Sequence, residues 1–105
     1  MDRDSVAALF EEAVDRAAAG EHGAVVSWTS GEDRWVQVTW DAVNLAYPHG
    51  RSPEEVLAGI ALPEYVTLRG WEAGSYVTFD HGAHDTTVLA DFVVACTERL
   101  WRPAA

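Results

Sequence analysis

The chain has little of what usually marks a secreted or membrane protein. It contains a single cysteine, Cys96, in 105 residues, which excludes an internal disulfide. Uncharged runs such as Gly23 to Gly31 are too short to span a bilayer. The first residues, Met1 to Asp4, lack the basic start and apolar stretch of a signal peptide. We therefore expect no membrane segment and a cytoplasmic location.

Lysine is absent as well, and the seven basic residues are all arginine, against 17 Asp and Glu. The net charge of −10 argues against nucleic acid as a partner, because phosphate binding requires basic side chains. It argues equally against an anionic membrane surface. The simplest role of so much acidity is solubility, although it would also suit an immunity-like inhibitor of a basic toxin.

Motifs that carry catalysis or hold a cofactor are also missing. The sequence has no Gly-rich phosphate loop and no nucleophile elbow. Cys96 lies on the apolar stripe of a helix pattern, which indicates a buried thiol rather than a nucleophile. Paired carboxylates such as Glu54-Glu55 fall at helix surfaces or starts. We therefore expect a protein that is not an enzyme and has no cofactor.

What the sequence does have is an ordered series of hydrophobic patterns. Helix spacing over 4–19 and 86–101 predicts two amphipathic helices, and Ser52-Pro53-Glu54-Glu55 predicts a short helix that begins with a capping box. Period-two or β-rich runs predict five strands, at 24–28, 34–40, 42–47, 65–69 and 75–79. The order α-βββ-α-ββ-α predicts one α+β domain over residues 1–105. Its five-stranded antiparallel sheet would carry the helices on one face.

Five tryptophans are the second notable feature, and the strand over 34–40 separates two of them. Its alternation places Trp40 with valines on one face, which we assign to the core beneath the helices. Trp35 then lies on the other face with Gln37 and Thr39. A large aromatic among polar neighbours on an open sheet face is typical of an interface, although single exposed tryptophans are also common. Trp28, Trp71 and Trp101 stand at element ends and suit either packing or contact.

The segment from Asp80 to Asp85 is the one cluster of metal-capable side chains in the sequence. It holds His81, His84 and two aspartates within six residues. The spacing matches no standard metal site, so we expect no metal, and Asp85 suits the cap of the following helix. A small enzyme or ligand-binding domain that uses this loop remains the alternative to a binding protein.

The element order and three short motifs resemble the type III secretion chaperone fold and its YbjN-type relatives, including actinobacterial peptide-binding chaperones. Arg34-Trp35-Val36-Gln37-Val38 is similar to the aromatic-Val-Gln strand of that group, and Arg69-Gly70-Trp71 to its Leu-Gly-Trp segment, with Arg69 in place of Leu. Residues 88–94, followed by Leu100, are similar to its closing helix. The resemblance implies a protein that binds a peptide or partner protein and forms a homodimer.

These observations give a first hypothesis for the site. A peptide or partner protein would bind to the open sheet face, with Trp35, Gln37, Thr39 and Trp71 as contact residues. We expect Trp35 to be the main anchor, and truncation of Trp40 to unfold the domain.

Overall fold

The computed structural model describes residues 1–31, 33–82 and 85–101. It confirms the α+β class and the predicted order of elements. The helices are α1 (Arg3–Ala18), α2 (Pro53–Val56) and α3 (Thr86–Leu100), and the strands are β1 (Val26–Thr29), β2 (Trp35–Val38), β3 (Ala42–Ala46), β4 (Thr67–Glu72) and β5 (Tyr76–Asp80).

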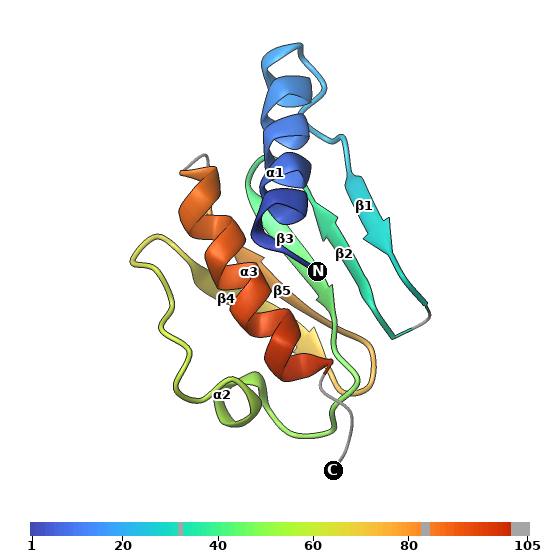
Figure 1. Cartoon of the computed structure of the whole chain (residues 1–105), viewed down its shortest axis with the longest axis vertical. Coiled ribbons are helices and arrows are strands. Elements are labelled where there is room, and N and C mark those ends of the chain that lie inside the picture. Colours follow the sequence, from blue (N-terminus) through green and yellow to red (C-terminus); the bar gives the residue numbers. More distant parts are fainter. Residues whose placement is uncertain (32, 83–84, 102–105) are drawn as a thin grey trace.

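The five strands form one antiparallel sheet in the order β1-β2-β3-β5-β4 (Figure 1). Consecutive strands pair except at β3, where the chain leaves through α2, enters the edge as β4 and returns beside β3 as β5. The strand β3 is thus central and is paired on both sides, to β2 and to β5.

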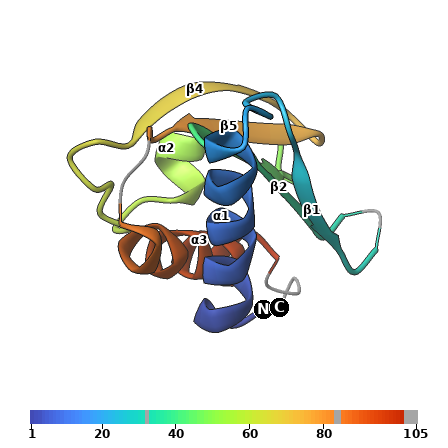
Figure 2. The same ribbon diagram turned by 90° about the horizontal axis from the view of Figure 1, so that it is seen from above.

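The helices lie on one side of this sheet, as predicted for α1 and α3 (Figure 2). Both contribute apolar stripes to a single core with the inward side chains of the strands. Its largest fully buried members are Tyr47, Phe10, Leu45, Leu89, Leu100, Val6, Val36, Val38, Val43, Val77, Val93 and Cys96. Each buried valine or leucine side chain stabilises the fold by roughly 1.5–3 kcal/mol. Burial also raises the pKa of the Cys96 thiol to about 12.

The helix ends agree with the sequence in part. Asp85 caps α3, where its carboxylate accepts from the amide of Thr87 at 2.8 Å, as predicted. The cap of α1 is Asp2, which accepts from the amide of Ser5 at 2.7 Å, so the helix begins one residue before the predicted start at residue 4. The Asp2 hydrogen bonds lower the pKa of that carboxyl.

The short helix α2 begins at Pro53 as expected, but its predicted capping box does not form. The Ser52 side chain makes no capping hydrogen bond to the helix. Proline at the first position fixes a helical φ and has no amide to satisfy, so the turn forms without a side-chain cap. The following connection, residues 57–66, leads to β4 without a further helix or strand.

The assignment of Trp40 to the core was wrong. The strand β2 ends at Val38, so the alternation that put Trp40 with Val36 and Val38 stops two residues before it. Its ring is half-buried and lies edge-on to the ring of His22, with centroids 5.9 Å apart. The chain turns there into β3, and this turn brings Trp40 to the other side of the sheet.

Two further tryptophans have packing roles that the sequence left open. The rings of Trp28 and Trp101 stack with centroids 5.8 Å apart and an interplanar angle of 12°. The indole N–H of Trp101 donates to the carbonyl of Ala46 at 3.2 Å. These contacts fasten the end of α3 to the sheet. Within the described residues, no helix is long and apolar enough to cross a membrane.

Candidate binding face

The side of the sheet opposite the helices is not covered by any described helix, and we call it the open face. It carries the strand side chains that alternate with the core residues. A row of five residues crosses all five strands in register there: Ser27, Gln37, Asn44, Thr78 and Gly70. In antiparallel pairs, residues directly opposite each other point to the same face, so these residues form one continuous surface.

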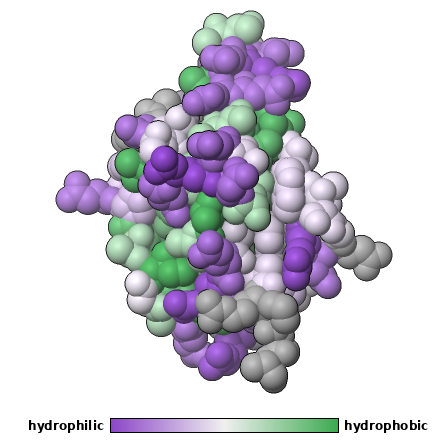
Figure 3. Space-filling view, in the orientation of Figure 1, coloured by the Kyte–Doolittle hydropathy of each residue, from purple (hydrophilic) through white to green (hydrophobic). Residues whose placement is uncertain are grey.

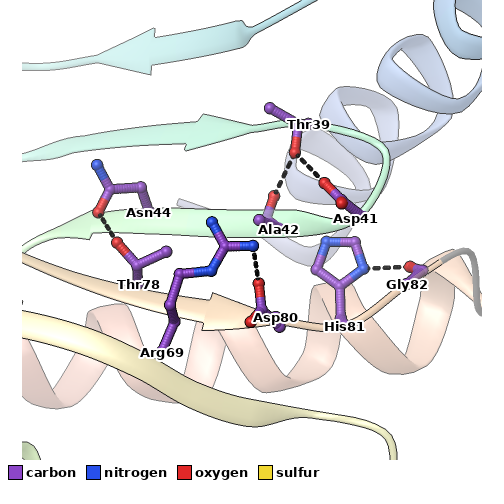
Figure 4. A network of polar contacts seen from close by, with 9 residues as sticks. All are labelled: Thr39, Asp41, Ala42, Asn44, Arg69, Thr78, Asp80, His81 and Gly82. Atoms are coloured by element: carbon purple, nitrogen blue, oxygen red, sulfur yellow. Dashed lines mark hydrogen bonds and ion pairs between the residues drawn. The ribbon is translucent and has the colours of Figure 1, made fainter. Parts of the chain in front are cut away.

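The centre of the row is joined by side-chain hydrogen bonds. The Thr78 hydroxyl donates to Oδ1 of Asn44 at 2.8 Å (Figure 4). Nδ2 of Asn44 donates to Oε1 of Gln37 at 3.3 Å. The side-chain amide of Asn44 therefore bridges two strands, because its oxygen accepts from β5 and its nitrogen donates to β2. We call Gln37, Asn44 and Thr78 the polar ladder. It holds hydrogen-bonding groups in fixed positions on a half-exposed surface.

At one end of the open face lie two aromatic residues. Tyr76 is paired with Ala46. The register of β2 against β3, continued by one residue from the pair Val36 and Leu45, places Trp35 on the other side of Ala46. Both rings are half-buried, while Ala46 between them is 1% exposed. A small residue flanked by two large ones is covered by its neighbours, so this end of the face presents aromatic surface that no described helix covers.

At the other end lies an ion pair between Arg69 and Asp80 (Figure 4). The ladder between β4 and β5 shifts between Leu68 and Gly70, which leaves Arg69 as the extra residue of a β-bulge. Leu68 faces the core and Arg69 faces the open face by ordinary alternation, and the bulge then keeps Gly70 on the open side and moves Trp71 to the helix side. The hydrogen bond and charge of Asp80 raise the pKa of the Arg69 guanidinium.

A shallow depression of about 410 Å³ lies beside this ion pair. Its wall includes Trp40 and His22, its floor includes the polar ladder, and Arg69 closes it on the side of β4. The Thr39 hydroxyl donates to the Asp41 carboxylate at 2.9 Å at its margin. The depression thus offers an aromatic ring, amide and hydroxyl groups, a guanidinium and the carboxylate of Asp41 to one ligand.

The structure brings together three of the four contact residues proposed from the sequence. Trp35 and Gln37 lie on the open face, and Thr39 lines the depression with Gln37. Trp71 does not join them, because it is paired with Val77, whose side chain is buried on the helix side. Its ring is 37% exposed at the edge of the sheet and meets the edge of Tyr47.

The described residues of the cluster from Asp80 to Asp85 have separate structural roles. Asp80 pairs with Arg69, and Asp85 caps α3. His81 is 3% exposed, with its ring edge-on to Phe10 at 5.2 Å. His84 lies outside the described residues. Among residues 1–31, 33–82 and 85–101, no group of three metal-capable side chains is close enough to share an ion.

Sequence reasoning missed the polar ladder, the bulge at Arg69 and the place of Trp40. Period-two alternation puts Gln37, Asn44 and Thr78 opposite the apolar residues of their strands, but their contact depends on β5 pairing with β3. The one available signal for the bulge was Arg69-Gly70 within a strand pattern, because an isolated glycine there suggests an irregularity.

Comparison of the chain with protein-family models, with curated proteins and with solved structures gives no significant match.

Proposed function

We propose that this protein is a chaperone-like binding domain that holds an extended peptide, or an extended segment of a partner protein, on its open face. The observation that carries the proposal is the polar ladder, which stands between aromatic side chains on a face without a helix over it. An extended peptide presents alternating backbone and side-chain groups, and this surface has complements for both.

The dimensions of the row suit a short extended segment. The polar ladder and Gly70 span four strands, from β2 to β4, which at about 4.8 Å per strand is about 14 Å. About four extended residues cover that length at roughly 3.3–3.4 Å each. Amides and hydroxyls of the polar ladder would pair with the peptide backbone, and Trp35 and Trp40, which flank the β2 end of this row, would hold apolar side chains.

The hydrogen bonds within this face favour the binding of a ligand over simple hydration of the same polar groups. Asn44 has its side-chain hydrogen bonds already made within the protein, so the face loses little rotamer freedom when a ligand arrives. The charges of Arg69 and of the nearby carboxylates would determine which charged ends of a ligand can bind. No step of bond making or breaking is required of these residues.

We propose in addition that the chain works in the cytoplasm and pairs with a second copy. The single, fully buried thiol of Cys96 suits a compartment in which disulfides are rare. The half-buried aromatic end of the open face, around Trp35, would supply part of the contact between copies. Analytical ultracentrifugation over a range of concentrations measures the expected association.

A display selection of random peptides against the purified protein tests the peptide proposal. Bound peptides should lose at least about tenfold in affinity to both Gln37→Arg and Gln37→Glu, because a charge of either sign in the polar ladder opposes an extended backbone there. Gln37 is exposed, so the variants should fold. The control Val14→Arg, on the exposed side of α1, should bind as the parent does. Peptides insensitive to both Gln37 variants would refute the proposal.

A further inference from the structure

A second surface lies on the helix side of the molecule and is independent of the open face. An apolar cavity of about 290 Å³ opens between α2, the connection 57–66, and α3. Its apolar lining includes Leu57, Ile60, Leu62, Leu68, Phe79 and Phe92. Two members of the core, Phe79 and Phe92, thus border this cavity.

The cavity continues along α3 into a more open depression of about 420 Å³. Gly59, Ile60 and Phe92 line both, so the two form one groove. Along α3 its wall is built by Val88, Phe92 and Ala95, spaced by four and three residues on one helix face. Figure 3 shows hydrophobic residues gathered on this side of the molecule. We call this surface the α2–α3 groove.

Apolar side chains at the groove margin are exposed to an unusual degree. Leu62 is 50% exposed and Val88 is 42% exposed, on opposite walls. The walls are fixed to each other, because the Arg99 guanidinium donates to the carbonyls of Val56 at 3.1 Å and Ala58 at 3.0 Å. This contact holds the end of α2 and the start of the connection against α3.

The charges at the groove indicate what would fill it. Among the residues that line its two parts, the charged ones are Glu54 and Asp91, both exposed carboxylates. Asp91 meets Arg3 at 3.6 Å, but both partners are more than half exposed, so that pair is weak. The whole chain carries a net charge of −10, which adds attraction for cations.

We propose that the α2–α3 groove binds an amphipathic helix of a partner protein, with one apolar stripe and flanking basic residues. The groove has the form required for a helix laid along α3, since its apolar floor is elongated and bordered by carboxylates. One large apolar side chain would enter the cavity between Leu57 and Phe92. A second, one turn further, would lie against Val88, and basic side chains would reach Glu54 and Asp91.

The test uses a synthetic peptide of about 14 residues, with leucines at i, i+3, i+4 and i+7 and lysines between them. Fluorescence anisotropy measures its binding to the parent protein and to Val88→Glu, Leu62→Glu and the control Val14→Glu. Val14 is 37% exposed on α1, away from the groove. Each variant adds one negative charge to the protein. If charge attraction alone were responsible, the lysine peptide would therefore bind more tightly to all three variants.

Occupation of the groove predicts a different pattern. Val88→Glu and Leu62→Glu should weaken binding by about tenfold or more, because a carboxylate replaces an apolar contact. Val14→Glu should leave it equal or slightly stronger. A peptide with glutamates in place of the lysines should bind at least about tenfold less well to the parent. Glu54→Gln with Asp91→Asn should weaken the lysine peptide a few fold, whereas Glu12→Gln on α1 should not.

Three outcomes would overturn the proposal. One is the absence of saturable binding of the lysine peptide up to about 1 mM. The second is equal or tighter binding by Val88→Glu and Leu62→Glu, which would reveal charge attraction alone. The third is loss of self-association in Val88→Glu without peptide, which would make the groove a contact between two copies of this chain.

Discussion

Neighbouring residues of β3 show how differently the two faces of the sheet are built. Val43 and Leu45 point toward the helices and are 1% and 0% exposed. Asn44 between them points the other way, is half-exposed, and is held by hydrogen bonds to Gln37 and Thr78. The covered face is stabilised by removal of apolar area from water, whereas the open face keeps its order through polar contacts that a ligand can also use.

The largest expected effect is at the covered face. Leu45→Ala removes a fully buried side chain and should lower the free energy of unfolding by about 2–5 kcal/mol. Urea unfolding followed by circular dichroism measures the change. A loss below about 1 kcal/mol would mean that the core around β3 is not packed as described.

Trp40 distinguishes the structure from the interpretation based on alternation alone. A buried tryptophan would cost roughly 3–5 kcal/mol on truncation, enough to threaten the fold. Because the ring is half-buried beside His22, Trp40→Ala should cost only about 1–2 kcal/mol and leave the domain folded. Thermal melts decide between the two. If this variant is unfolded at 25 °C, the result would support a core position for Trp40 and contradict its half-buried place beside His22.

Cys96 adds a pH dependence to the covered face. Burial raises the thiol pKa from 9.0 to about 12, so the unfolded chain loses the proton first as pH rises. The stabilisation from this group is therefore complete below pH 9 and is lost between pH 9 and about 12. Between pH 8 and 10 the parent should lose about 1.4 kcal/mol more than Cys96→Ala, by urea unfolding. Equal losses would contradict the burial of the thiol.

The smallest expected effect is at the open face. Asn44→Ala breaks the polar ladder, but water can replace the lost hydrogen bonds on this half-exposed surface. The free energy of unfolding should fall by about 1 kcal/mol, well below the loss for the adjacent Leu45→Ala. If the two variants lose equal stability, the contrast between the faces is not real.

The elements themselves were predictable, because helix spacing and strand alternation are local properties of the chain. The faces of Val36 and Gln37 followed from that alternation, and the cap at Asp85 from its residue type. Trp40 was misplaced because the end of β2 at Val38 is not marked in the sequence, and alternation does not hold beyond the strand.

The candidate site was less predictable than the fold. The polar ladder needs β3 to pair with β5, which is decided by packing of the whole domain. The bulge at Arg69, which one glycine only suggests, shifts the alternation that follows Leu68. Trp71 was proposed as a contact residue with Trp35 although it follows the predicted strand 65–69, and only the register of β4 against Val77 separates the two.

That separation also gives the most direct test of the proposed function. Trp35 lies on the open face and Trp71 on the opposite side at the edge, so peptides selected on the parent protein should respond to them differently. We predict that Trp35→Ala weakens peptide binding by about thirtyfold, as the main aromatic anchor of a site does, whereas Trp71→Ala leaves it within about twofold. Equal losses, or a greater loss for Trp71→Ala, would contradict a binding site on the open face.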